Sequence, residues 1–342
     1  MTAHIGDVSG LSGPSITFLP MSNSKAASGS NDDDDLVWHY TNGVALQNII
    51  GRSELWASNT AFMNDTHERR LADRYLIQAK EKLGDSFPEM LDSYLDHVGD
   101  LYDNMRFRSP DMPDGTRYLL SASNDGDSLT MWRGYAGTDE VSYAIGLDRN
   151  QPLKILRPRP SEHGYSWTSG RATVSSWFNV IYDQKISERR AEQAIRDILA
   201  IFQTPSSSKE ELQLRTGDVF AAIGEKTEPL RNETKHHGFV DEKEARIIVN
   251  ASGDVTRYRP GRLGMVPYVA LTGNDDSQES IVEKSNPLPI RRIRMSPGPD
   301  RFYALRSLRD LLGANGYGGT FNEEFYRIED EIVVDASRIP FR

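Results

Sequence analysis

The chain has 342 residues, of which 37% are hydrophobic and 26% are charged, and it contains no cysteine. Disulfides, zinc–thiolate sites, iron–sulfur clusters and cysteine nucleophiles are therefore excluded. The formal charge of −10 repels phosphate, so a nucleic-acid partner would need a local basic groove. No apolar run reaches the roughly 18–20 residues of a membrane span, and the start MTAHIGDVSG does not resemble a secretory signal. These features predict a soluble, cytoplasmic protein with no membrane partner.

Residues 1–36 differ in composition from everything that follows. They are rich in Ser, Gly, Asn and Ala, carry the acidic run Asp32 to Asp35, and have no apolar period that could bury a face. Five aspartates against Lys25 give this segment a charge of −4, which leaves −6 for residues 37–342. We predict a disordered acidic leader followed by a single folded domain.

The rest of the chain alternates between strand and helix periods. Strands come from distant segments, which is typical of an α+β fold with a mixed or antiparallel sheet rather than a βαβ array. Helical insertions are expected at about 66–107 and 184–230. In chain order, we expect a strand at 36–41, a helix at 43–50, a strand at 54–58, helices at 66–83 and 87–107, strands at 118–123, 142–147 and 177–182, helices at 186–203 and 208–229, strands at 244–249, 265–270 and 290–294, a helix at 301–313 and a strand at 331–334.

Several common catalytic motifs are absent from the sequence. The chain has no phosphate-binding loop, no Gly-x-Gly-x-x-Gly after a strand, no His-Glu-x-x-His and no Gly-x-Ser-x-Gly. Its seven histidines show no i, i+4 ligand spacing. We therefore expect no metal site.

The first candidate segment combines His39, Tyr40 and Thr41. Strand alternation places His39 and Thr41 on one face, and Trp38 with Tyr40 on the other. An imidazole beside a hydroxyl can hold the hydroxyls and the amide of a ribose–nicotinamide unit. The alternative is a sheet histidine that is satisfied by a backbone carbonyl.

The second candidate segment runs from Asn64 to Glu68. Asp65-x-x-Glu68 is similar to a capping box for the helix that follows, because Asn64 or Asp65 can satisfy free backbone N–H groups. The same residues can also hold a loop that walls a pocket. Both interpretations are compatible.

The third candidate segment runs from Phe239 to Val249. Extended geometry places Glu242, Glu244 and Arg246 on one face of a strand. Arg246 can keep one carboxylate ionised while the other meets a substrate. The alternative is a ladder of ion pairs on the surface.

An aromatic pair lies between these segments. Trp132 and Tyr135 are three residues apart, so they share a helical face. They either belong to the core or form a wall on which a planar ring, such as nicotinamide, stacks.

Six ordered motifs resemble a large bacterial family of unknown function, and the likeness covers roughly 37–342. The family name implies no chemistry. The motifs are His39-Tyr40-Thr41, Leu55-Trp56-x-Ser58, Phe62-x-Asn64-Asp65-x-x-Glu68, Met131-Trp132-x-x-Tyr135, Glu242-x-Glu244-x-Arg246 and Ser337-x-Ile339-Pro340-x-Arg342.

The opening strand–helix–strand, with His-x-Thr and a second strand that closes in Ser, is also similar to the NAD-binding start of ADP-ribosyltransferases. This resemblance implies a sheet core of that type with inserted helices. It places His39 and Thr41 in the first element of the site and Glu244 in the last. Ser121 or Ser123 is the middle-strand candidate.

The same resemblance implies a mechanism with NAD as substrate. The nicotinamide–ribose bond would break through an oxocarbenium-like state that Glu244 stabilises, and Glu242 would take a proton from the acceptor. Trp132 or Tyr135 would stack on nicotinamide. The expected NAD-binding residues are His39, Tyr40, Thr41, Trp56, Ser58, Asn64, Ser121, Ser123, Trp132, Tyr135 and Arg246.

The acceptor is open between RNA, DNA and protein. Arginine clusters at 157–159, 257–262 and 291–294 can steer a nucleic acid, although solvated surface arginines explain them equally well. The resemblance suggests a toxin or phage-defence effector, with an antitoxin as a partner. Two other classes stay open: a nucleotide- or peptide-binding module without turnover, and a metal-dependent nuclease or hydrolase.

Overall fold

The computed structural model describes residues 33–62, 66–84, 116–135, 141–158, 172–202, 223–251, 255–262, 264–298, 301–317 and 332–340. Residues 1–32, the helix expected at 87–107 and the first part of the helix expected at 208–229 lie outside the described residues. Within the described part of the chain, no helix combines the length and the apolarity that crossing a bilayer requires.

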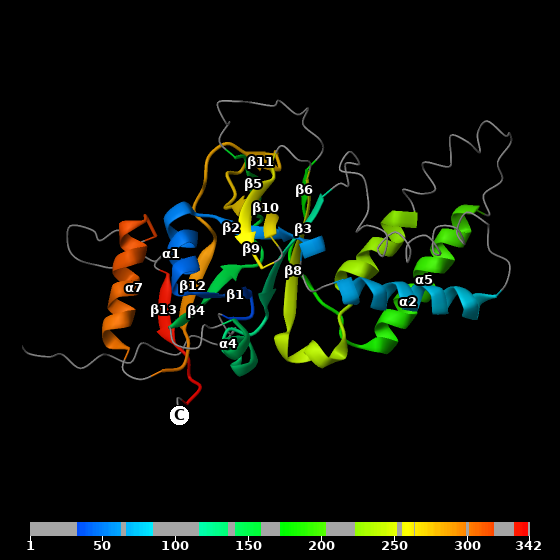
Figure 1. Ribbon diagram of the computed structural model, residues 1–342, viewed down its shortest axis with the longest axis horizontal. Helices are drawn as coiled ribbons and strands as arrows, with labels where there is room; N and C mark the ends of the chain where they lie inside the picture. The colour runs from blue at the N-terminus through cyan, green and yellow to red at the C-terminus, as the bar shows by residue number, and fades with distance from the viewer. Residues whose placement is uncertain are drawn as a thin grey trace, which may run out of the picture. The chain divides into compact units, whose positions relative to one another are not determined.

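Thirteen strands of the described residues form one mixed sheet, which confirms the predicted sheet type. Most neighbours are antiparallel, while β11 pairs with β5 and β12 with β13 in parallel. The central path runs β11-β5-β10-β2-β3-β1-β4-β12-β13 (Figure 1). The strands are β1 (Leu36–Asn42), β2 (Leu55–Asn59), β3 (Thr116–Ser123), β4 (Ser142–Asp148), β5 (Lys154–Leu156), β6 (Thr173–Val174), β7 (Phe178–Asn179), β8 (Glu244–Ala251), β9 (Arg257–Gly261), β10 (Gly264–Thr272), β11 (Ile281–Val282), β12 (Ile290–Met295) and β13 (Val333–Ala336).

The helices bury apolar side chains, and the first of them also begins at a side-chain cap. In the first of them, the Asn42 side chain accepts a hydrogen bond from the Ala45 N–H at 2.8 Å, and Leu46, Ile49 and Ile50 form the buried stripe. The helices are α1 (Gly43–Arg52), α2 (Thr66–Leu83), α4 (Leu129–Tyr135), α5 (Gln184–Phe202), residues 223–233 and α7 (Phe302–Ala314), with short 3-10 helices η1 (Thr60–Phe62) and η3 (His237–Glu242).

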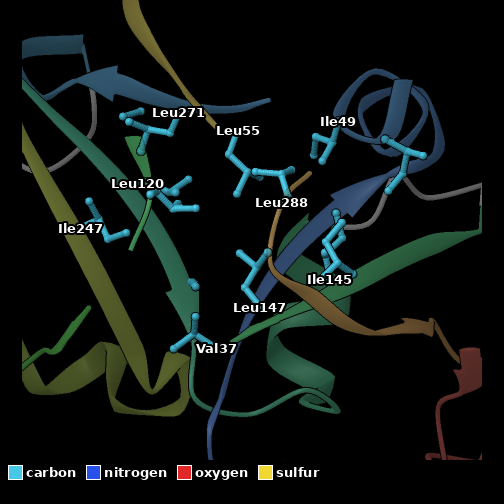
Figure 2. Close-up of a cluster of buried hydrophobic side chains, with 14 of the residues drawn as sticks. Val37, Ile49, Leu55, Leu120, Ile145, Leu147, Ile247, Leu271 and Leu288 are labelled. Atoms are coloured by element: carbon cyan, nitrogen blue, oxygen red, sulfur yellow. The ribbon is translucent and has the colours of Figure 1, made fainter. Parts of the chain in front are cut away.

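The largest core lies on one face of the sheet. It joins apolar residues of β1, β2, β3, β4, β8 and β10 to the buried faces of α1 and α7. Figure 2 shows part of this cluster, with Ile49 of α1 beside side chains from several strands. A smaller core on the other face of β1 contains Trp38, Tyr40, Met131 and Trp132. The period-2 pattern of β1 therefore buries both of its faces.

A separate apolar cluster holds the helical insertions together. Leu76 of α2, Ile195 of α5 and Leu230 of the 223–233 helix belong to it. The buried Arg231 donates to Asp73 of α2 at 2.7 Å. These helices occupy the two sequence regions that were expected to be helical insertions.

The folded part of the chain includes the end of the acidic run. The Asp33 carboxylate accepts hydrogen bonds from Arg292 at 2.6 Å and from Arg294 at 3.3 Å, and Leu36 opens β1. The last residues of the expected leader are therefore part of the fold.

Candidate functional site

Strands β3 and β8 position the central polar residues. Ser121 lies opposite Arg246, and Ser123 lies opposite Glu244, so these four side chains share one face of the antiparallel pair. The alternate residues of both strands, such as Ala122, belong to the main core. Strand alternation in the sequence thus selects which face is polar.

The Glu244 carboxylate is the best-connected group on this face. Its Oε1 accepts from Ser121 Oγ at 2.6 Å and from Arg246 Nε at 2.9 Å. Its Oε2 accepts from Arg246 Nη2 at 2.9 Å and from Lys235 Nζ at 2.7 Å. A carboxylate has about four lone-pair sites, so these four donors fill them.

Glu244 is ionised despite being only 5% exposed. Burial raises the pKa of its carboxyl, but the charges and hydrogen bonds of Arg246 and Lys235 outweigh burial and bring the pKa below its usual value. Arg246 is 2% exposed, and it also donates a hydrogen bond from Nη1 to the Asn232 carbonyl at 3.0 Å. The expected alternative of a surface ion-pair ladder is wrong for this pair, because both partners are buried.

Glu242 belongs to the same cluster but comes from η3 rather than from β8. The expectation of one extended strand through Glu242 is wrong: Glu242 ends η3, and Lys243 has a left-handed backbone with φ of 44°. The turn still brings the two carboxylates together, because Lys235 Nζ donates to Glu242 Oε2 at 2.8 Å as well as to Glu244. Glu242 is the more accessible of the two carboxylates.

The His39 side chain is connected to this cluster by a hydrogen bond to the backbone of Ser121. Strand β3 pairs with β2 at Tyr118 and Leu119 and with β1 at Ser123. Between these two contacts, the Ser121 carbonyl accepts a hydrogen bond from His39 Nδ1 at 3.1 Å. This is the sheet histidine satisfied by a carbonyl that the sequence offered as the alternative. Because Nδ1 carries the donated proton, Nε2 is the acceptor of the neutral ring.

Replacing His39 with Asn is expected to make stability less sensitive to acid. Burial lowers the pKa of His39 in the folded chain, whereas the hydrogen bond to Ser121 raises it less. The unfolded chain therefore binds more protons, and wild-type stability falls as pH drops below about 6.5. Asn keeps a donor for the carbonyl but does not titrate. Urea unfolding between pH 7.5 and 5 should show a flatter profile for the variant, and equal slopes would contradict the assignment.

Tyr40, Thr41, Ser123 and Trp132 lie in buried positions. The Tyr40 hydroxyl donates to the Asp125 carbonyl at 2.7 Å and accepts from the Ser128 N–H at 3.0 Å. Burial raises the Tyr40 pKa, so the hydroxyl stays protonated. The Ser123 hydroxyl donates to the Glu242 carbonyl at 2.7 Å. Ser121 is therefore the middle-strand serine that reaches Glu244.

The expected aromatic wall is divided between core and surface. Trp132 is buried, lies edge-on to Tyr40 with ring centroids 4.7 Å apart, and donates from Nε1 to Asp127 at 2.9 Å. Tyr135 is exposed. The core interpretation therefore holds for Trp132, since a buried ring offers no open face to a ligand.

The two candidate residues of β2, Trp56 and Ser58, contact β10 and β9 rather than the Glu244 cluster. Trp56 packs on Tyr268 of β10 with ring centroids 4.5 Å apart, and Ser58 Oγ accepts from Arg259 of β9 at 3.1 Å. The Ser58 contact joins β2 to one of the arginine clusters. Asn64 lies outside the described residues, as do Asp65 and the side chain of Glu68.

A pocket of about 270 Å³ adjoins the Glu244 cluster. Its lining comes from α2, from Tyr182 and the start of α5, and from residues 235–237. Tyr182 and Lys235 connect it to the cluster, because the Tyr182 hydroxyl accepts from the Glu244 N–H at 2.8 Å. The sequence contained no motif that marked either residue; only their position beside Glu244 reveals them.

The described residues include no group of three or more His, Asp or Glu placed to hold a metal ion. Searches of curated proteins and of solved structures found no significant match. A family model described as "Protein of unknown function (DUF2971)" matches residues 131–247, a segment that contains the Glu242, Glu244 and Arg246 motif. The chain is therefore similar, from residue 131 to residue 247, to a family of unknown function, as the ordered motifs indicated for that segment.

Proposed function

We propose that this protein is an NAD-dependent ADP-ribosyltransferase with its site at Ser121, Glu242 and Glu244. One observation carries the proposal. The Ser121 hydroxyl donates a hydrogen bond to Glu244 at 2.6 Å, and the Ser121 carbonyl accepts a hydrogen bond from His39 Nδ1 at 3.1 Å. Three residues that the resemblance selected from separate strands are thus linked through one residue.

The ionised Glu244 would supply the electrostatic part of the reaction. The glycosidic bond between C1′ of the ribose and nicotinamide breaks, nicotinamide leaves with the bonding electrons, and positive charge develops on the ribose. A buried carboxylate whose pKa is held below its usual value stays negative and stabilises that charge. The acceptor oxygen or nitrogen then bonds to C1′, and Glu242 takes its proton.

Ligand binding at Glu244 requires one of its four donors to leave. Arg246 makes a two-pronged contact with the carboxylate, and Lys235 bridges both glutamates, whereas Ser121 offers a single neutral hydroxyl. Charge-assisted hydrogen bonds are about twice as strong as neutral ones. A ribose hydroxyl would therefore replace Ser121 Oγ on Glu244 Oε1.

Replacing Glu244 with Gln is expected to slow nicotinamide release about 10²–10³-fold, the usual effect of removing one such electrostatic group. Purified protein is incubated with NAD and an RNA, DNA or protein acceptor, and free nicotinamide is measured by chromatography. Glu279→Gln, an exposed carboxylate outside the cluster, is the matched control and should keep the wild-type rate. Circular dichroism and thermal melting verify that both variants are folded. A folded Glu244→Gln variant with the wild-type rate would disprove the role of Glu244.

A binding module without turnover is the second candidate. The observation that favours it is the full occupancy of the Glu244 carboxylate by four donors, which is what a structural ion-pair cluster needs. Calorimetry distinguishes the two functions, because a module binds NAD or another nucleotide without releasing nicotinamide. If Glu244→Gln bound NAD as tightly as the wild type, and the wild type released no nicotinamide, the protein would be a binding module.

A further inference from the structure

The pocket beside the Glu244 cluster has a lining of hydrogen-bond donors. Arg74 and Tyr75 come from α2, Tyr182 and Ser187 from the entry to α5, and Lys235 and His236 from the loop before η3. None of the described residues that line it is acidic. This composition distinguishes the pocket from the adjoining Glu244 cluster, which contains two carboxylates.

Two hydroxyls in the pocket have hydrogen-bonding capacity to spare. Ser187 is 1% exposed and lines the pocket, and its hydroxyl carries one proton that it can donate. The Tyr182 hydroxyl accepts the Glu244 N–H, but its own proton has no acceptor in the same part of the chain. Burial and the nearby carboxylates raise the pKa of Tyr182 to about 12, so that proton stays in place at neutral pH. Both hydroxyls can therefore donate to a ligand.

The histidine in the pocket is oriented as a donor too. His236 Nδ1 accepts a hydrogen bond from the Gly238 N–H at 3.1 Å. The proton of the neutral ring is therefore on Nε2. Nε2 adds a third donor from a third segment.

The described side chains that line the pocket are neutral or positively charged. Lys235 and Arg246 balance Glu242 and Glu244 within the cluster. Arg74 is exposed, and its charge acts on Tyr75 together with that of Glu188, whose carboxylate accepts a hydrogen bond from Gln184 of the lining at 2.7 Å. The Asp183 carboxylate, at the start of α5, accepts the Ile186 N–H at 3.0 Å and does not line the pocket. A guanidinium beside hydroxyl and imidazole donors suits an anion with several acceptor oxygens.

We infer that this pocket binds a phosphate monoester, with Arg74 on the phosphate oxygens and Ser187, Tyr182 and His236 as further donors. The pocket volume is near the lower end for ligand sites, and Leu71 and Tyr75 give it an apolar side. A terminal phosphate with part of its attached sugar fits that combination. The phosphate belongs either to a free nucleotide or to the end of a nucleic-acid strand.

Isothermal titration calorimetry on the full-length chain tests this inference with uridine 5′-monophosphate and uridine. We expect the monophosphate to bind at least about tenfold more tightly than uridine. Arg74→Ala should weaken monophosphate binding by about 10–100-fold, and Ser187→Ala by about fivefold. Arg196→Ala, an exposed arginine of α5 outside the pocket, is the matched control and should bind like the wild type.

Oligonucleotides with a 5′-phosphate or a 5′-hydroxyl identify the source of the phosphate. Tighter binding of the phosphorylated oligonucleotide than of the mononucleotide would assign a nucleic-acid end, and equal or weaker binding would assign a free nucleotide. Equal affinity for the monophosphate and uridine, no binding of either, or wild-type affinity in Arg74→Ala and Ser187→Ala would overturn the inference. The uridine probes contain neither adenine nor nicotinamide, so a failure here leaves NAD cleavage untouched, and the reverse also holds.

Discussion

Replacing Arg246 with Met is expected to lower the free energy of unfolding by about 3–5 kcal/mol, because it leaves a buried carboxylate without its main partner. The Arg246 guanidinium holds both oxygens of Glu244 at 2.9 Å, and both residues are almost completely buried. Urea unfolding at pH 7 measures the loss. Arg196→Met, on an exposed face of α5, is the matched control and should change stability by less than about 0.5 kcal/mol.

A second variant shows whether charge or packing causes the loss. The double variant Glu244→Gln/Arg246→Met removes the orphan charge and should be more stable than Arg246→Met alone. In the wild type the folded pKa of Glu244 lies below its unfolded value, so the stability it contributes is lost as pH falls through that lowered pKa. In Arg246→Met this loss should begin at higher pH. If the free energy of unfolding of Arg246→Met lay within 1 kcal/mol of the wild-type value, a stabilising role for the Glu244–Arg246 pair would be refuted.

Replacing Trp38 with Ala is expected to cost about 3–5 kcal/mol of unfolding free energy, which is the usual range for removing a large buried aromatic ring. Trp38 is 0% exposed, and the Arg294 guanidinium lies 4.7 Å from its ring centroid. Glycine at 126 leaves room for the ring, since a Cβ there would lie 2.2 Å from Trp38 Cε2. The variant removes a packing partner from β1, α4 and β12 together.

Thermal and urea unfolding of Trp38→Ala and Trp38→Phe separate ring volume from ring chemistry. Trp38→Phe keeps an aromatic face for Arg294 and leaves a smaller cavity, so it should lose clearly less stability than Trp38→Ala. Equal losses in the two variants would show that the indole itself, rather than the filled volume, is required. A loss below 1 kcal/mol in Trp38→Ala would show that Trp38 does not support this core.

Most of the regular elements could be predicted because their periods are local. The helix expected at 66–83 is α2, and the strands expected at 118–123 and 244–249 lie within β3 and β8. Short strands such as β5 and β11 carried no periodic signal, because three or fewer residues cannot show one. The turn at Lys243 was missed for a related reason: a single left-handed residue ends η3 and precedes β8 without changing the sequence pattern around it.

The candidate site, like the fold, could be predicted from the sequence only in part. Alternation along β3 and β8 is a property of the sequence alone, and it determined that Ser121, Glu244 and Arg246 would face away from the apolar residues between them. Only the tertiary structure decided which partners meet there. Ser121 and Glu244 are 123 residues apart, and strand register and loop closure bring them together. Lys235 and Tyr182 join the cluster from segments without a motif, because a buried carboxylate takes its donors from whatever the fold places within reach.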